Sequence, residues 1–401
     1  MLYRSGAHGL AVFLWCLAAS VAIAPAASRD AELWKGLKRG PYEVGIAIRH
    51  ERDPDRLFGA QNAPRPIQIL VWYPASPAAG KKPVTYEDYF KSAATEIIFS
   101  TTGPQYEQRH IQEVREMVRT SGGSEKLFDR EVVRSTWAMA DAVPAAGVFP
   151  LLIYAPGLSG KSFQNVVLCE YLASHGFVVA ASPSVGPRSR DMPQTLDGMQ
   201  AQIDDIRFIM KTMSRIRYVN AGQTGVIGYS WGGMAALLAA MTGDAGAISA
   251  VAALDPNLMV KNGHALARTA PGYAPADLRI PVMLAIASGR EWMERDRGFF
   301  DELTAAEASL LEFLDFTHGD FSSVIIQFIK ETRTDLKKKE IDRVVLGYAT
   351  LCRYLEAFFS SHLQGDAPAQ AYLQASPAEN RVPSAVLTIK RSSPQVVSPA
   401  P

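Results

Sequence analysis

One serine in this chain stands in surroundings that favour nucleophilic chemistry. Ser230 lies in Gly228-Tyr229-Ser230-Trp231-Gly232, between an apolar run that begins at Thr224 and a segment rich in alanine and leucine. This pattern predicts a strand, a sharp turn and a helix, the arrangement that exposes the hydroxyl of a nucleophilic serine. Glycine suits both flanking positions, because the turn requires strained backbone angles and a close approach of strand and helix. We predict that Ser230 is a nucleophile, with an ordinary Gly/Ser turn as the alternative.

A serine hydroxyl needs a base at neutral pH, and the base needs a third group to orient it. Where a serine sits on such a turn, the chain order is serine, acid, histidine. Three histidines follow the serine: His264, His318 and His362. His318 comes just after the apolar run 310–316, which predicts a loop at the carboxyl edge of a sheet. We therefore predict that His318 is the base; a surface loop histidine is the alternative.

Two carboxylates could orient the base. Asp255 directly follows the apolar run 248–254, one strand after the nucleophile, and Glu291 comes after the next run at 282–286. Position alone does not separate them. Asp255 is followed by proline, so it could also serve as a helix N-cap.

An acyl-transfer site also needs two backbone N–H groups that face the developing negative charge. One is expected from the residue after the nucleophile, Trp231. The other is expected from the glycine-containing loop 155–160, where Leu158 is the candidate donor. An ordinary glycine turn is the alternative for this loop.

The elements that would position these residues begin with two strands at 42–48 and 67–73, separated by a charged loop. From Phe149 onward, apolar runs alternate with helical segments. The predicted strands lie at 150–154, 176–181, 224–228, 248–254, 282–286 and 310–316, and the clearest helices at 163–174 and 201–213. This alternation predicts a mostly parallel sheet with helices on both faces. Ligands then bind beyond the carboxyl ends of the strands.

The composition of the two ends of the chain and of one long insertion predicts the domain organisation. An apolar run ending near Ile23, followed by small residues, predicts a signal peptide over residues 1–26 with cleavage near Ala26. We expect one domain over 27–370, with a helical or irregular insertion over about 86–142 that forms a lid. The Ala/Pro/Ser-rich tail 371–401 is expected to hold at most one short strand, at 385–389, and a disordered end. The mature protein is expected to be secreted or periplasmic.

Charge and apolar content exclude several classes of partner. The chain has 41 basic and 40 acidic residues, and loss of Arg4 with the signal leaves 40 against 40. This balance gives no electrostatic footprint for nucleic acid, and no stretch after the signal is apolar enough to span a membrane. The expected chemistry calls for no metal and no organic cofactor.

Cys169 and Cys352 could form a disulfide or remain buried thiols, and the sequence does not define an oligomeric state.

The chain also resembles a known family, the platelet-activating factor acetylhydrolase branch of the α/β-hydrolases, with its bacterial dienelactone-hydrolase-like relatives. The segments that carry the resemblance run in the same order: 40–45, 68–74, 155–158, 172–177, the turn at Ser230, 253–255 and 317–318. The resemblance implies an α/β-hydrolase fold, favours Asp255 over Glu291 as the acid, and supports Leu158 as a donor. The chain differs from the family in having Pro156-Gly157 where His-Gly is usual. The insertion does not align with the family, so the resemblance does not indicate which substrate this chain acts on.

Together these features predict a serine hydrolase of carboxylic esters, acting on small molecules through an acyl-enzyme. Ser230 would attack, His318 would serve as base and then acid, and Asp255 would orient it. The insertion is expected to cover the nucleophile and to favour short acyl chains, in contrast to the long-chain esters of lipid degradation. Amide, lactone or polyester hydrolysis by the same residues is one alternative, and a non-catalytic binding scaffold is another.

Overall fold

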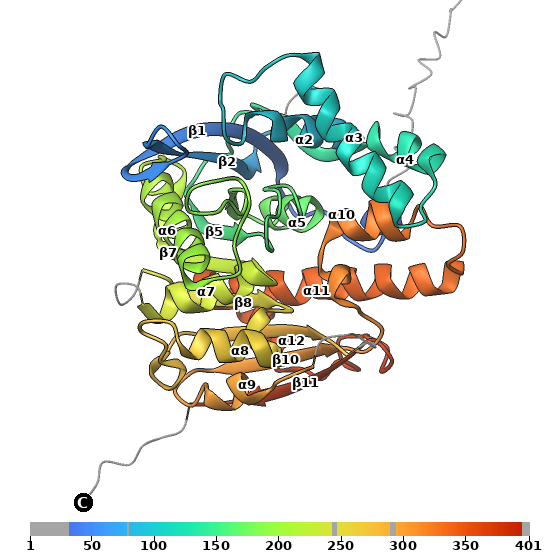
Figure 1. Ribbon diagram of the computed structural model, residues 1–401. Coiled ribbons are helices and arrows are strands. Elements are labelled where there is room, and N and C mark those ends of the chain that lie inside the picture. The colour runs from blue at the N-terminus through green and yellow to red at the C-terminus, as the bar shows by residue number, and fades with distance from the viewer. Residues whose placement is uncertain (1–31, 78–79, 243–246, 289–293, 395–401) are drawn as a thin grey trace, which may run out of the picture.

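The computed structural model describes residues 32–77, 80–242, 247–288 and 294–394 (Figure 1). The expected signal peptide, the alternative acid Glu291 and the end of the tail lie outside these residues.

The described residues form one sheet of eleven strands in the order β11-β10-β9-β8-β7-β5-β6-β2-β1-β4-β3. Strands β5 to β10 are parallel to one another, while β11, β2 and β3 run antiparallel to the neighbours that they pair with. The strands are β1 (Glu43–Phe58), β2 (Ala63–Ala75), β3 (Pro83–Thr85), β4 (Ser135–Ala140), β5 (Phe149–Ala155), β6 (Val178–Ala181), β7 (Val219–Tyr229), β8 (Ala250–Leu254), β9 (Val282–Ala287), β10 (Ala308–Phe313) and β11 (Leu387–Ser392).

Helices surround this sheet. The α-helices are α1 (Glu32–Lys35), α2 (Tyr86–Ser92), α3 (Pro104–Thr120), α4 (Glu125–Val132), α5 (Val166–Ser174), α6 (Leu196–Met213), α7 (Trp231–Thr242), α8 (Lys261–Arg268), α9 (Gly298–Glu302), α10 (Ser323–Ile325), α11 (Lys338–Gln364) and α12 (Ala367–Gln374). Short 3-10 turns are η1 (Ala93–Thr95), η2 (Asn257–Met259), η3 (Pro275–Asp277) and η4 (His318–Phe321), and η5 (Ile326–Lys330) is a π-helical turn.

Both faces of the sheet are buried, which explains why its central strands are continuously apolar. On β5, Leu152 and Tyr154 point to the face covered by α5 and α11, while Leu151 and Ile153 point to the face covered by α6 and α7. Cys169 on α5 and Cys352 on α11 lie on the same face, and both are buried and unbonded. The structure therefore has buried thiols at these positions rather than a disulfide.

The early strands are longer than the sequence predicts. The sequence predicts a charged loop between the strands at 42–48 and 67–73, but β1 continues to Phe58 and β2 begins at Ala63, and the two pair as an antiparallel hairpin. Exposed and partly buried residues alternate along β1. Because charged side chains lie on its exposed face, the second half of β1 does not form an apolar run and was not predicted as a strand.

Two other predictions need correction. The 86–142 insertion is not only helical or irregular, because it ends in strand β4, which pairs with β1 in parallel. The region after Gly365 contains helix α12, capped by the Asp366 side chain and started by a proline, in addition to a strand. That strand, β11, lies at 387–392 rather than 385–389 and pairs antiparallel with β10.

The helices of the insertion pack beside the segment that follows His318. Figure 1 shows α3 and α4 next to α10, and both helices contact η5. Phe128 of α4 lies edge-on against Phe328 of η5, with ring centroids 5.7 Å apart. The insertion is therefore held against a loop that follows the carboxyl edge of the sheet.

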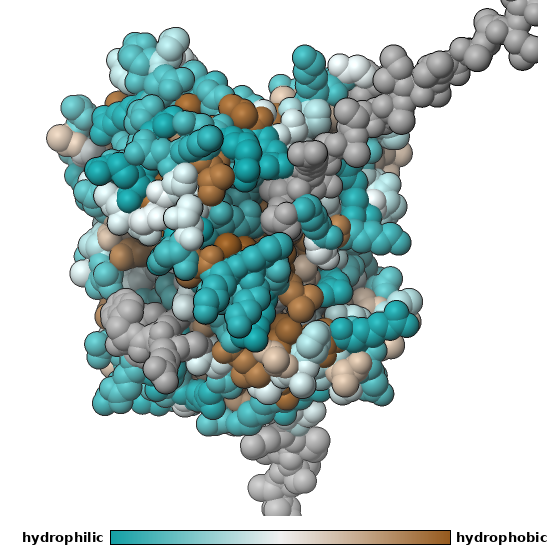
Figure 2. Space-filling view, turned by 90° about the vertical axis from the view of Figure 1, so that its right-hand side faces the viewer, coloured by the Kyte–Doolittle hydropathy of each residue, from teal (hydrophilic) through white to brown (hydrophobic). Residues whose placement is uncertain are grey.

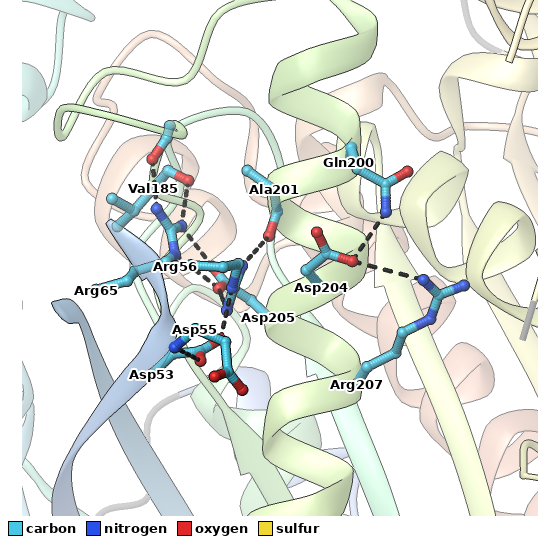
Figure 3. Close-up of polar contacts among 11 residues, drawn as sticks. Asp53, Asp55, Arg56, Arg65, Val185, Gln200, Ala201, Asp204, Asp205 and Arg207 are labelled. Atoms are coloured by element: carbon cyan, nitrogen blue, oxygen red, sulfur yellow. Dashed lines mark hydrogen bonds and ion pairs between the residues drawn. The ribbon is translucent and has the colours of Figure 1, made fainter. Parts of the chain in front are cut away.

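A buried ion-pair network fixes the loop 182–195 on the other side of the site (Figure 3). Arg65 is 1 % exposed and binds both carboxylate oxygens of Asp205 on α6, at 2.8 and 2.7 Å. The same guanidinium donates to the carbonyl oxygens of Val185 and Gly186, at 2.8 and 2.6 Å. Because both Asp205 oxygens and two carbonyls accept from it, this buried charge is compensated.

One face of the molecule is shown in Figure 2. Hydrophilic residues cover most of it, and hydrophobic residues lie in patches between them. Among the residues that the structure describes, no helix combines the length and the apolar character needed to cross a membrane.

Candidate active site

Ser230 lies on a tight turn between β7 and α7. Its φ is +56°, a left-handed conformation that is unusual for a residue with a side chain. A Cβ atom on Gly228 would lie 2.2 Å from the carbonyl oxygen of Gly232, and one on Gly232 would lie 2.2 Å from that of Ala155. Both glycines are therefore required by close backbone contacts, as the sequence pattern indicated.

The structure brings Ser230, His318 and Asp255 together. The Nε2 atom of His318 lies 2.9 Å from Oγ of Ser230, and its Nδ1 atom lies 2.6 Å from Oδ2 of Asp255. An ionised carboxylate only accepts, so the Asp255 contact assigns the ring proton to Nδ1 and leaves Nε2 free to accept from the serine. A hydroxyl, an imidazole and a carboxylate in this order can generate a serine nucleophile.

The loop that carries His318 is held by its own polar contacts. Asp320 Oδ2 accepts from the backbone N–H and the hydroxyl of Thr317, at 2.7 and 2.8 Å. The Asp320 carboxylate is fully buried and pairs with Lys330. The Tyr229 ring stacks on the imidazole of His318, with centroids 5.0 Å apart. These contacts limit the orientations open to the imidazole.

Asp255 sits at the end of β8 with its side chain fully buried. Its φ is +42°, and its backbone N–H donates to Ala285 at 2.6 Å. Besides His318, the carboxylate accepts from the backbone N–H of Ala287 at 3.0 Å. The bonds to these donors mean that Asp255 orients a side chain here and does not act as the helix cap that its proline neighbour suggested.

Arg295 is a second charged partner of Asp255 that the sequence did not indicate. Its guanidinium donates to both carboxylate oxygens, at 2.6 and 3.2 Å. Burial alone would raise the pKa of Asp255, but the hydrogen bonds from His318 and Arg295 outweigh burial and lower it. The carboxylate is thus held in its ionised form.

Asn257 is a second residue that the sequence did not indicate. Its side-chain oxygen lies 3.2 Å from Oγ of Ser230. Since the serine has one hydroxyl proton, it can donate to only one of His318 and Asn257 at a time. When His318 accepts, the Asn257 contact requires the amide to turn its N–H towards the serine, an orientation that heavy-atom positions do not distinguish.

The loop after β5 forms a tight turn next to the serine. The Gly160 N–H donates to the Gly157 carbonyl at 2.8 Å, and Ser159 has a φ of +51°. The Gly157 N–H is occupied by the side chain of Gln164, at 2.8 Å. By contrast, the N–H groups of Leu158 and Trp231 donate to no acceptor within the described part of the chain. Both predicted donors thus remain available to a ligand.

Three segments meet around this turn. Glu96, which follows η1 in the insertion and is 2 % exposed, accepts from Lys161 at 2.9 Å and from Arg190 at 3.1 Å. Arg190 also donates to the carbonyl oxygen of Ser159, at 3.2 Å. The insertion is therefore linked through two cations to the turn that carries Leu158.

A cavity of about 670 Å³ opens beside the serine. Trp231 and Asn257 belong to its wall, together with residues of α8 and of the loop before α6. Asn257 thus borders the cavity and also contacts the hydroxyl of the candidate nucleophile.

The other histidines that follow the serine lie elsewhere. His264 is buried, with Nδ1 2.8 Å from Asp296 and Nε2 2.9 Å from the Tyr273 hydroxyl, so both ring nitrogens are occupied. His362 lies on α11. Across the described ranges, no group of three or more His, Cys, Asp or Glu side chains is placed to hold a metal ion.

Comparison with known proteins finds likenesses among solved structures. No family model and no curated protein sequence matches the chain. The structure is similar to that of ferulic acid esterase from Streptomyces cinnamoneus, with a TM-score of 0.59 and 21% sequence identity, over 88% of this chain and 96% of the other. At this identity the likeness shows the fold. The mixed sheet with helices on both faces is consistent with the α/β-hydrolase fold that the sequence predicts.

Proposed function

We propose that this protein is a serine hydrolase of carboxylic esters that works through an acyl-enzyme on Ser230. One observation carries the proposal: the unbroken series of contacts from Ser230 through His318 to Asp255, at 2.9 and 2.6 Å. The structural likeness to a ferulic acid esterase and the sequence resemblance to platelet-activating factor acetylhydrolases both support an ester as the substrate.

In the proposed mechanism, His318 takes the Ser230 proton as Oγ attacks the ester carbonyl. The negative charge that develops on the carbonyl oxygen accepts hydrogen bonds from the N–H groups of Leu158 and Trp231. Trp231 is also the first residue of α7, so the helix N-terminus adds a favourable dipole. His318 then protonates the leaving alcohol. Water, deprotonated by His318, releases the acid from Ser230 by the reverse sequence.

Asp255 has a separate role in this mechanism. The imidazole becomes positively charged in the transition state, and the buried carboxylate stabilises that charge while fixing the ring orientation. The lowered pKa of Asp255 keeps it ionised for this role through the neutral and mildly acidic range.

The substrates that we propose are small esters with short acyl chains, and the setting that we propose is outside the cytoplasm. The apolar segment near residue 20 supports export. Short acyl chains are supported by the insertion, which reaches the oxyanion turn through Glu96 and so limits the space on that side of Ser230.

Labelling with a fluorophosphonate tests the proposal directly. We expect one covalent adduct, on Ser230. The Ser230→Ala variant should form no adduct, and its rate of p-nitrophenyl acetate hydrolysis should be lower by several orders of magnitude. Ser249→Ala, on a serine outside the site, is the matched control and should keep both. A folded Ser230→Ala protein with near-normal turnover would refute the mechanism, and a wild-type protein without adduct or turnover would indicate a binding scaffold.

A series of p-nitrophenyl esters from acetyl to palmitoyl tests the acyl-length part separately. We expect kcat/KM to be highest for the shortest chains. A maximum at long chains would show that the insertion shapes a lipid site.

A further inference from the structure

The cavity beside Ser230 is lined by side chains that can both donate and accept hydrogen bonds. Its wall includes three carboxamides, from Gln194, Asn257 and Asn262. Each carboxamide offers two N–H donors and a carbonyl acceptor. Trp231, Val260 and Leu266 belong to the same wall, so the cavity combines apolar surface with hydrogen-bonding groups, as small-molecule pockets commonly do.

The charges at the rim of the cavity cancel. Lys261 Nζ lies 3.1 and 3.2 Å from the two carboxylate oxygens of Glu294, and both side chains are well exposed. The backbone N–H of Lys261 also donates to the Glu294 carbonyl at 3.0 Å, which holds the two segments together. An anionic ligand would therefore meet Glu294, and a cationic ligand would meet Lys261.

A buried donor without an acceptor lies in the same wall. Trp231 is 1 % exposed, and its indole Nε1 finds no hydrogen-bond partner among the residues that the structure describes. A buried tryptophan N–H normally has a partner. Because Nε1 is itself buried, this donor is not exposed to a ligand in the cavity.

The cavity is joined to the reacting atoms at two points. Asn257 contacts Ser230 Oγ at 3.2 Å, and Trp231 supplies one of the two N–H groups proposed to face the oxyanion. The cavity therefore adjoins two residues of the proposed ester site.

We propose that this cavity binds a neutral, polyhydroxylated part of the substrate, such as a sugar or the acyl group of a sugar acid. Hydroxyl groups can donate and accept, so they can satisfy the carboxamides of the wall, and an uncharged ligand suits the cancelled charge at the rim. An alkyl chain would remove water from the same polar groups without replacing its hydrogen bonds. This proposal rests on the ester hydrolysis proposed above and names the substrate class for that site.

Two pairs of esters of matched size test the proposal, with p-nitrophenyl acetate as the reference substrate. The first pair is 6-O-acetylglucose and hexyl acetate, which differ in the alcohol. The second is hexyl gluconate and hexyl hexanoate, which differ in the acyl group. We expect kcat/KM for the hydroxylated ester to exceed that of its alkyl partner by about tenfold or more in one pair, which identifies the half of the ester in the cavity.

Variants show whether the cavity causes the preference. In the double variant Gln194→Leu/Asn262→Leu, which removes the hydrogen bonds at nearly constant volume, the preference should fall by about tenfold. Gln200→Leu is the matched control, because Gln200 lies on α6 outside the cavity and bonds to Asp204 (Figure 3). It should leave the preference unchanged.

The possible failures are distinct. Equal or faster turnover of the alkyl esters in both pairs, or a preference that the double variant leaves intact, would overturn the cavity assignment while ester hydrolysis stands. Absence of any Ser230-dependent hydrolysis of p-nitrophenyl acetate would refute the proposed function, and the cavity assignment with it.

Discussion

Arg295 should set the lower pH limit of activity. The guanidinium binds both oxygens of the carboxylate that orients His318, at 2.6 Å from Oδ1 and 3.2 Å from Oδ2 of Asp255. Asp255 stabilises the imidazolium that forms during catalysis, whereas the positive charge of Arg295 opposes it. Replacing Arg295 by glutamine removes that opposition and keeps a hydrogen-bond donor of related shape. We therefore expect the acidic limb of the pH–rate profile to move to higher pH in Arg295→Gln.

The size of the effect follows from the distances. Two contacts of 2.6 Å, on opposite oxygens of one carboxylate, separate the guanidinium from the imidazole. At an effective dielectric constant of about 20, two like charges about 6 Å apart repel by roughly 3 kcal/mol. This energy corresponds to about 2 pH units. The side chains of Arg295 and His318 are 21% and 30% exposed, so water screens part of the repulsion. We expect a displacement of about 1 pH unit after this screening.

The assay is kcat/KM for p-nitrophenyl acetate between pH 4 and 9. The matched control is Arg297→Gln, which removes the same charge two residues away, where the exposed guanidinium pairs with Glu312. The control profile should coincide with that of the wild type. An acidic limb that stays in place in Arg295→Gln, moves to lower pH, or moves equally in Arg297→Gln would refute the reasoning.

Three further predictions concern the support of the site. Glu96→Gln should weaken the hold on Arg190 and so lower kcat by about tenfold with KM little changed, because a displaced oxyanion donor affects the transition state more than substrate binding; a change in KM alone would contradict this. Gly232→Ala should prevent stable folding, since its Cβ would lie 2.2 Å from a backbone oxygen, whereas Gly222→Ala, whose nearest contact is 3.4 Å away, should fold normally in a thermal melt. Burial raises the pKa of Glu170 from 4.5 to about 7, so the folded state holds a proton that the unfolded chain releases, and stability should fall by about 3 kcal/mol between pH 4.5 and 7. Urea unfolding should show this fall in the wild type and not in Glu170→Gln, and equal slopes in the two proteins would disprove it.

The parallel part of the sheet could be predicted closely from the sequence. Strands β5, β8 and β9 are buried on both faces, so each appears as a continuous apolar run. Strand β7 begins at Val219 rather than 224, and β10 ends at Phe313 rather than 316, because partly exposed residues interrupt the apolar pattern of both. The β1–β2 hairpin could not be delimited in the same way, because one side of β1 carries charged residues. Helix α12 was missed because its Ala/Pro/Gln composition is also typical of disordered tails.

Within the site, a residue could be predicted when its role depends on its neighbours in the sequence, and could not when the role depends on contacts with distant segments. Ser230 is marked by its own neighbours, since the turn requires glycine on both sides. His318 required only that it follow an apolar strand. Asp255 was preferred over Glu291 on the family resemblance, because both follow an apolar strand and position alone does not separate them. Arg295 and Asn257 act through contacts between loops that follow different strands, and an arginine or an asparagine in a polar loop carries no local signal of such a contact.

The three left-handed backbone conformations at the site lower the stability of the folded protein. Ser159, Ser230 and Asp255 have φ values of +51°, +56° and +42°, and each costs about 1 kcal/mol or more relative to a right-handed conformation. A library of random variants that is sorted only for folding yield would therefore gain little from keeping these residues. One sorted for turnover would retain all three. These three positions are thus expected to change first when the chain is evolved in the laboratory for thermal resistance alone.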